Sequence, residues 1–182
     1  MIKNTTALIL GVCIFISMPA CKQKHAHAGD IVFYNPIEYN DFVVDHQNAI
    51  IRHMVNLTQA FDNGTEQEIR IQYKSLTARS DSSLDVIMQL SDYEGDSVLK
   101  AAAVDLLKFY NQVFHEQYKD MIEIFLKGET ASDAEIEKLN QHVIYIRNKE
   151  DTLNTKLNAA QTAFAKKFQF DFDDQTPENF SK

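Results

Sequence analysis

Hydrophobic residues recur at alternating steps of four and three in the first half of the chain, which is the spacing of an amphipathic helix in a bundle. The first such block opens at Asn35-Pro36, where Asn35 suits an N-cap and Pro36 the first helical position, and it closes at Asp62-Asn63-Gly64. The spacing therefore predicts a helix between these two points. Its core stripe consists of Val43, Gln47, Ile50, Met54, Leu57 and Phe61.

A second block begins at Thr65, which forms a Thr-x-x-Glu capping box with Glu68. The run Ser80-Asp81-Ser82-Ser83 interrupts its hydrophobic stripe, and these residue types favour local bonds from side chain to backbone over a helix interior. Such a run is compatible with a kink or with a break for a turn. We favour one continuous helix that extends to Leu90.

Two further blocks complete the helical part of the chain. The third helix is expected to start within residues 91–96 and to end at Gly128, a residue that suits a helix C-terminus. The fourth begins at Ser132, with Glu135 as its capping partner, and its stripe is the most regular in the chain. That stripe consists of Ile136, Leu139, Val143, Ile146, Glu150, Leu153, Leu157, Ala160 and Phe164.

Four amphipathic helices with short loops close most simply as an all-α, up-down-up-down antiparallel four-helix bundle with long helices. We predict this bundle over residues 35–168, with helices that span about 37–54 Å at the usual helical rise. The chain has only 5 Gly and 3 Pro and is 45% hydrophobic, in agreement with long helices and short connections. Residues 169–182 alternate aromatic and acidic side chains, and we expect them to form a flexible acidic tail.

The first twenty residues follow a different pattern. Lys3 precedes an apolar run from Ala7 to Met18, which is too short to cross a bilayer because a crossing needs roughly 20 residues. The run matches the hydrophobic region of a signal peptide, and the small residue Ala20 stands directly before Cys21. Residues 1–20 are therefore predicted to be a cleaved signal peptide.

The segment Met18-Pro19-Ala20-Cys21 resembles the signal of bacterial lipoproteins, in which a small residue precedes the modified cysteine. The resemblance implies cleavage before Cys21, acylation of its thiol, and attachment to a membrane through lipid, with residues 21–34 as a lipidated tether. Two alternatives remain open. One is ordinary secretion after cleavage at Ala28, and the other is a cytosolic protein with an apolar start.

The chain is acidic, with a net charge of −8 that becomes −9 once Lys3 is removed with the signal. An acidic surface repels the phosphates of nucleic acid, so we expect no nucleic-acid partner. Cys13 is lost with the signal and Cys21 is blocked by acylation, which leaves no thiol for a disulfide in the mature chain. Its stability must then come from packing.

The histidines do not fall into a metal-binding motif. Di-iron bundles need Glu-x-x-His pairs, but the residues three before His46, His53, His115 and His142 are not acidic. The chain also lacks Cys-x-x-Cys-His, His-Glu-x-x-His and Gly-x-Ser-x-Gly. We expect no metal ligand, no cofactor and no catalytic residue, and a metal- or cofactor-binding periplasmic bundle is the alternative.

Four polar residues fall near the middle of the predicted bundle. Gln47, Ser80 and Glu150 interrupt their stripes, and Arg147 lies one turn from Glu150. A polar layer in an apolar core is costly unless its members satisfy one another. The layer is either a small polar cavity that holds a ligand or a substrate, or a device that sets helix register, with Glu150 facing solvent.

The segment from Tyr39 to Gln47, together with the signal and the capped helices, resembles uncharacterised small helical lipoproteins of Bacteroidetes-type bacteria. The resemblance implies an outer-membrane lipoprotein that faces the periplasm. We predict a non-enzymatic binding or scaffold module of the cell envelope. Its partners would be the membrane, through the N-terminal lipid, and an envelope protein.

Overall fold

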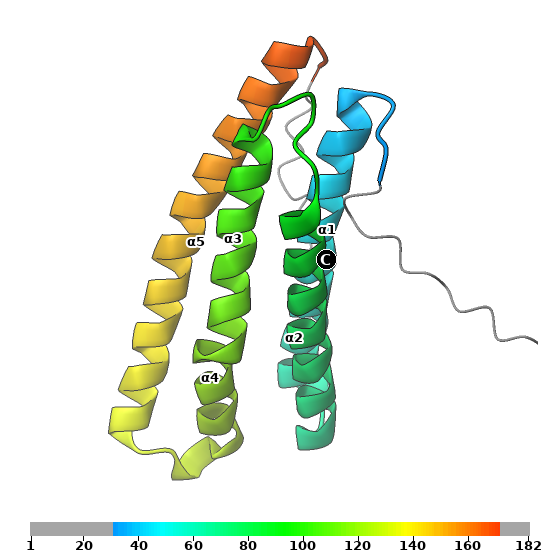
Figure 1. Ribbon diagram of the computed structural model, residues 1–182. Coiled ribbons are helices and arrows are strands. Elements are labelled where there is room, and N and C mark those ends of the chain that lie inside the picture. The colour runs from blue at the N-terminus through cyan, green and yellow to red at the C-terminus, as the bar shows by residue number, and fades with distance from the viewer. Residues whose placement is uncertain (1–30, 172–182) are drawn as a thin grey trace, which may run out of the picture.

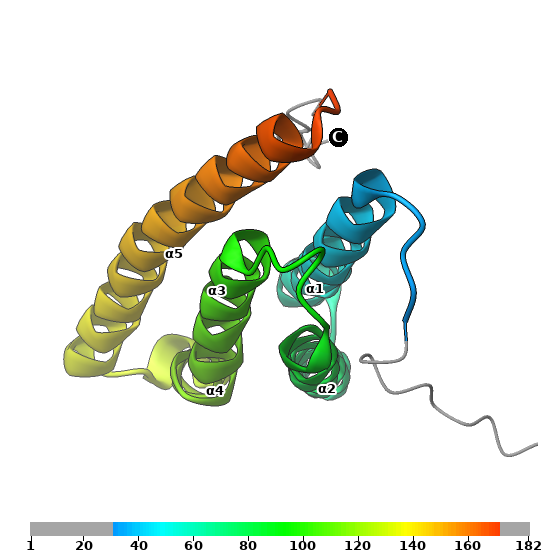
Figure 2. The ribbon, with the colours of Figure 1, turned by 45° about the horizontal axis from the view of Figure 1, so that its top comes forward.

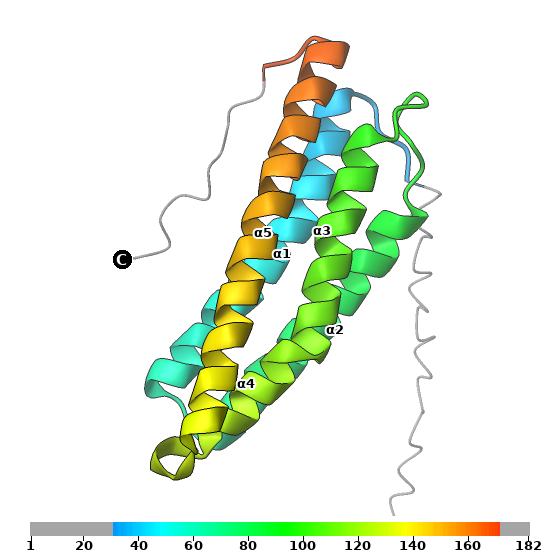
Figure 3. The same ribbon diagram turned by 90° about the vertical axis from the view of Figure 1, so that its left-hand side faces the viewer.

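The computed structural model describes residues 31–171 of the 182-residue chain. Over that range the protein is all-helical and has no strand, only an isolated bridge between Tyr93 and Asp96. The helices pack together along a common long axis, so the molecule is elongated (Figures 1 and 3). They are α1 (Pro36–Asn63), α2 (Glu66–Gln89), α3 (Val98–His115), α4 (Gln117–Leu126), the 3-10 turn η2 (Gly128–Thr130) and α5 (Asp133–Phe168).

The predicted N-terminal features lie outside the described residues. These are the signal peptide of residues 1–20, Cys21, and the tether as far as residue 30; residues 172–182 of the predicted tail are outside as well. Within residues 31–171, none of the helices combines the length and the apolar character that a membrane span requires.

The predicted helix starts at α1, α2 and α5 are confirmed. Asn35 Oδ1 accepts a hydrogen bond from the backbone N–H of Glu38 at 2.9 Å, and Pro36 occupies the first turn of α1. Thr65 and Ser132 each form a complete capping box with the glutamate three residues on. These caps satisfy N–H groups that have no partner inside the helix, so the starting points follow from local sequence.

Helix α2 continues through the serine-rich run, as favoured from the sequence. Ser80 and Ser83 are both fully buried, and Ser83 Oγ lies 3.2 Å from His46 Nδ1 of α1. A serine that finds a partner on the neighbouring helix does not compete with its own backbone. The small side chains therefore sit inside the packed interface between α1 and α2 without ending the helix.

The predicted third helix differs from the structure at its start and in its middle, whereas its observed end at Leu126 lies close to the expected Gly128. It begins at Val98, beyond the expected range, because Glu94 and Gly95 adopt φ of 46° and 78° in a tight turn. It is also interrupted at Glu116, which separates α3 from α4 with φ −107° and ψ −76°. The two segments still follow one another along the bundle (Figure 1).

Buried side chains from α1 to α5 form one hydrophobic core. At one end of the bundle, Tyr39 of α1 stacks on Phe164 of α5 at 5.6 Å between ring centroids. Tyr93, from the connection between α2 and α3, lies 5.4 Å from Tyr39 and 5.7 Å from Phe164. This aromatic cluster joins three segments that are distant in sequence, and each close ring pair stabilises the fold beyond its buried area.

The stripe predicted for the fourth helix is only partly buried. Ile146, Leu157 and Phe164 of α5 belong to the core, whereas Ile136 and Val143 are 46% and 38% exposed. The assignment of these two residues to the core was wrong. Helix α5 packs mainly against α3 and α4 and contacts α1 at few positions. Helices α5 and α2 lie on opposite sides of α3 (Figure 2).

Candidate functional site

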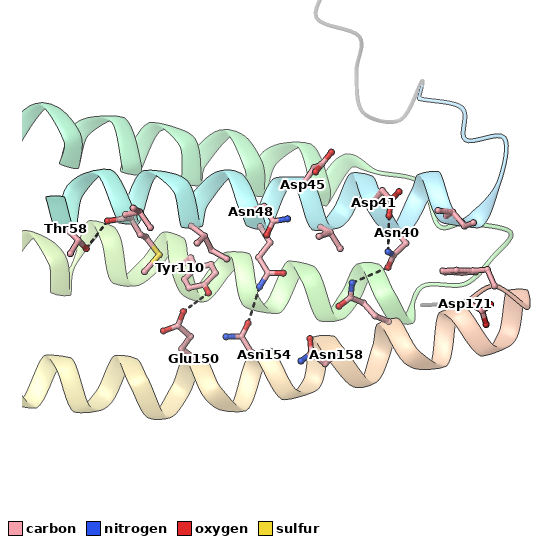
Figure 4. Close-up of a pocket in the computed structure, with 18 residues that line it drawn as sticks. Asn40, Asp41, Asp45, Asn48, Thr58, Tyr110, Glu150, Asn154, Asn158 and Asp171 are labelled. Carbon is pink, nitrogen blue, oxygen red and sulfur yellow. Dashed lines mark hydrogen bonds between the residues drawn. The ribbon is translucent and has the colours of Figure 1, made fainter. Parts of the chain in front are cut away.

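A groove of about 820 Å³ lies between α1 and α5 (Figure 4). Tyr110 of α3 contributes to its floor, and Phe170 and Asp171 close it near the end of α5. Its other lining residues are Ile37, Asn40, Asp41, Val44, Asp45, Gln47, Asn48, Ile51, Met54, Val55, Thr58, Glu150, Asn154, Asn158 and Gln161.

The structure brings together two of the four residues of the predicted polar layer. Gln47 and Glu150 both line the groove. Ser80 is instead fully buried on α2, where its Oγ has no hydrogen-bond partner among the described groups. Arg147 is exposed and does not line the groove. The four residues thus occupy three different environments and do not form a single layer.

The wall formed by α1 carries a second stripe beside its core stripe. Its members follow steps of four and three from residue 37 to residue 58, so they share one face of the helix. Only one stripe, the core stripe, was predicted for this helix. The periodic signal that reveals the second stripe is Ile37, Asp41, Val44, Asn48, Ile51, Val55 and Thr58.

The wall formed by α5 is a row of polar side chains. Glu150, Asn154 and Asn158 follow steps of four and project towards α1 (Figure 4), and Gln161 lies three residues further along. Asparagines 154 and 158 and Gln161 were not predicted as site residues, although their spacing after Glu150 places them on one helical face. Amide side chains offer both donors and acceptors, which suits recognition of polar groups.

Hydrogen bonds connect the two walls and the floor. Gln161 Nε2 donates to Asn40 Oδ1 at 3.2 Å, between two buried side chains, and Gln47 Nε2 donates to Asn154 Oδ1 at the same distance. Tyr110 donates its hydroxyl proton to Glu150 Oε1 at 2.7 Å. These bonds hold α5 against α1 at the middle and at one end of the groove.

The charged side chains that line the groove are all acidic. Its eighteen described lining residues include four carboxylates, those of Asp41, Asp45, Glu150 and Asp171, and no lysine, arginine or histidine. Burial raises the pKa of Tyr110, and the nearby Glu150 raises it further. Tyr110 therefore stays protonated as a donor across the physiological range.

Two histidines of α1 face α2 and not the groove. His46 Nδ1 lies 3.2 Å from Ser83 Oγ, and His53 Nδ1 lies 3.1 Å from Ser75 Oγ. Burial lowers the pKa of both imidazoles, and the positive charge of Arg79 lowers it further. Both rings are half-buried at the border between the two helices.

The other two described histidines pair with aspartates and not with each other. His115 Nε2 lies 2.8 Å from Asp81 Oδ1 of α2, and His142 Nε2 lies 3.5 Å from Asp120 Oδ2 of α4. In the part of the chain that the structure describes, no three His, Cys, Asp or Glu side chains gather where they could hold a metal ion. His25 and His27 of the tether lie outside that part.

No family model matches the chain, and no curated protein or solved structure matches it either. The function is therefore inferred from the chemistry of the α1–α5 groove and from the N-terminal sequence.

Proposed function

We propose that the protein is an exported, lipid-anchored module of the cell envelope that binds a ligand in the α1–α5 groove and catalyses no reaction. The observation that carries the binding role is the groove itself, where two helices present facing rows of polar and apolar side chains. Acylation of Cys21 would anchor the module to the outer membrane on its periplasmic side.

The side chains of the groove support binding more than chemistry. Asn40, Gln47, Asn154 and Gln161 hold one another in hydrogen bonds across the walls, which orients their remaining donors and acceptors. Tyr110 is held as a donor to Glu150, and its raised pKa is opposite to what a general base near neutral pH requires.

We further propose that the helices follow the up-down-up-down antiparallel order. Contacts between α1 and α2 support this order, because His46 meets Ser83 whereas the later His53 meets the earlier Ser75. Towards α5, Lys156 bonds Asp105 of α3 at 2.5 Å and Lys138 bonds Asp120 of α4 at 2.5 Å. In both interfaces the residue numbers increase along one helix while those of the contacting residues decrease along the other, as in antiparallel neighbours.

This order places the start of α1 and the end of α5 at the same end of the groove. Tyr39, near the start of α1, stacks there on Phe164 of α5. The end of the groove with Asn40 and Asp171 is therefore the one that follows the predicted tether along the chain.

Photo-crosslinking in intact cells tests the proposal. A photoreactive residue at Val44 or Asn158 lies in the groove, and the same residue at Asp85, on the exposed face of α2, is the matched control. We expect a discrete crosslinked species from the groove positions that is absent from the control. Equal crosslinking from all three positions, or none from the groove, would refute the binding role.

The anchor is tested separately. Cys21→Ser removes the thiol that acylation needs, so the variant is expected to appear in the soluble envelope fraction while the parent protein sediments with membranes. Continued sedimentation of the variant with membranes would contradict lipidation. A soluble parent protein that begins at residue 29 would favour secretion after cleavage at Ala28.

A further inference from the structure

The second stripe of α1 has the features of a seam between two helices. Ile37, Val44 and Ile51 follow each other at intervals of seven residues, and each is followed four residues later by Asp41, Asn48 or Val55, which completes a heptad pattern. Branched side chains repeating in this way form the contact line of paired helices. Here, however, Val44, Ile51 and Val55 are only half-buried, and Ile37 is 46% exposed.

On α5, two apolar residues precede the lining residue Glu150 on the same helical face. Val143 and Ile136 precede Glu150 by one and two heptads, so they lie on the same face of the helix, and both are exposed. The α1 wall therefore combines apolar and polar side chains, whereas α5 presents a polar row in the groove and apolar side chains before Glu150, outside the lining. Neither row is covered by any other helix in residues 31–171.

The length of the groove favours an elongated occupant. From Ile37 to Thr58, α1 advances by about 32 Å at the helical rise of about 1.5 Å per residue. A helix of about 20 residues has the same length. A compact small molecule would contact only part of these two rows.

The negative charge of the groove favours an occupant with positive charge. Four carboxylates and no cation line it, and the exposed Arg147 lies just outside the lining, one turn before Glu150. The residues after Gln169 carry four acids and one lysine, so the chain's own tail has the wrong sign. A second copy of the mature chain, with a net charge of −9 after Lys3 is removed, would also bring like charge.

We propose that the groove binds a basic amphipathic helix of another envelope protein, which completes the seam between α1 and α5. Its apolar side would pack on Val44, Ile51 and Val55, and its lysines or arginines would face Asp41, Asp45 and Glu150. This inference rests on the proposed binding role of the groove and names the class of partner.

Designed peptides test the proposal on the mature chain from residue 21 with Cys21→Ser. The probe is a fluorescent 21-residue peptide with leucine at the two seam positions of each heptad and lysine at most others. The controls are a glutamate version and a scrambled peptide of identical composition. Fluorescence anisotropy should show binding of the first peptide and binding at least about tenfold weaker for both controls.

Substitutions then locate the binding surface. Asp41→Asn with Asp45→Asn should weaken binding of the leucine–lysine peptide by about tenfold, and Val44→Ser with Ile51→Ser by at least as much. Asp85→Asn with Asp151→Asn removes the same charge from exposed positions outside the groove and should leave affinity within about twofold. Circular dichroism at several temperatures verifies that each variant is folded, and the aspartate pair avoids any loss of packing.

Three results would overturn the inference. The first is no binding of the leucine–lysine peptide. The second is equal binding of the scrambled peptide, or equal weakening by the control pair, since either indicates general attraction to an acidic surface. The third is a dimer in sedimentation that Val44→Ser with Ile51→Ser dissociates, because the groove would then accept a second copy.

The peptide test and the crosslinking test can fail independently. If groove crosslinks form in cells but the basic amphipathic peptide does not bind, the assignment of the partner is wrong and the binding role of the groove stands. If neither crosslinks nor peptide binding are found, the proposed function itself is wrong.

Discussion

The hydroxyl of Tyr110 donates a 2.7 Å hydrogen bond to Oε1 of Glu150, which connects the floor of the groove to its α5 wall. Tyr110 is 2% exposed, whereas Glu150 is half-buried, so the bond lies at the boundary between core and groove. It explains how a glutamate is accommodated within an otherwise apolar stripe of α5. A carboxylate that accepts a bond from a buried hydroxyl need not be fully solvated.

Tyr110→Phe should therefore destabilise the protein by about 1–3 kcal/mol, because Glu150 loses its donor while the ring is retained. Urea unfolding measures the change. Tyr145→Phe is the matched control, since Tyr145 is 46% exposed on α5, and its effect should stay within about 0.5 kcal/mol. Equal effects of the two substitutions would mean that the bond to Glu150 contributes nothing.

The two buried serines of α2 should respond differently to alanine. Ser80 Oγ has no partner among the described groups, so Ser80→Ala should leave stability unchanged or raise it by up to about 1 kcal/mol. Ser83 Oγ bonds His46, so Ser83→Ala should lower stability by about 1 kcal/mol. Thermal unfolding of both variants provides the comparison. If Ser80→Ala were the more destabilising of the two, the assignment of an unbonded Ser80 and a bonded Ser83 would be wrong.

Stability should fall as the pH drops from about 7.5 towards 5. Burial, and then Arg79, lowers the pKa of His46 and His53 below the usual 6.5, so the folded state disfavours their protonation. Above pH 6.5 the imidazoles of His46 and His53 are neutral in both the folded and the unfolded protein, and the full stability is present. Below pH 6.5 the unfolded protein binds protons first, so stability is lost until the pH reaches the lower pKa of the folded state.

Denaturant midpoints between pH 7.5 and 5 measure this dependence. His46→Gln with His53→Gln should flatten the slope, because both imidazoles with lowered pKa are removed. Carboxylates with lowered pKa, such as Asp96 and Glu135, titrate below this window. A slope that persists in the double variant would contradict the assignment.

The ion pair between Asp96 and Lys167 should fix the connection between α2 and α3 to the end of α5. Lys167 Nζ lies 2.6 Å from Asp96 Oδ2, and Asp96 Oδ1 accepts from the N–H of Val98 at 3.0 Å. Burial would raise the pKa of Asp96, but the bonds from Lys167 and from the backbone outweigh burial and lower it.

Lys167→Met should lower stability by about 1–3 kcal/mol, because it leaves the buried carboxylate of Asp96 without its cation. Lys166→Met is the neighbouring control, since Lys166 is exposed and has no ion pair among the described residues. Its effect should stay within about 0.5 kcal/mol. Calorimetric unfolding of the two variants compares them directly, and similar losses would show that the pair is not stabilising.

Features that depend on neighbouring residues in the chain were predictable from the sequence. Asn35, Thr65 and Ser132 begin helices where predicted, because a cap bonds backbone groups within three residues of itself. The burial of Val43, Ile50 and Leu57 on α1 was also predictable, since helical periodicity places these residues on one face. The tight turn at Glu94 and Gly95 was missed, so the third helix was expected to start within residues 91–96 and not at Val98.

The sequence by itself determined that the chain forms capped amphipathic helices, and its N-terminal pattern is the basis on which a signal peptide and a lipid anchor at Cys21 are predicted. Only the tertiary structure decided that Gln47 and Glu150 share a groove, that Ser80 is buried without a partner, and that Arg147 is exposed. It also decided that Ile136 and Val143 remain exposed. The physical reason is that periodicity fixes which residues share a helical face, whereas their burial depends on how closely the facing helix approaches. Helix α5 packs against α3 and α4 more than against α1.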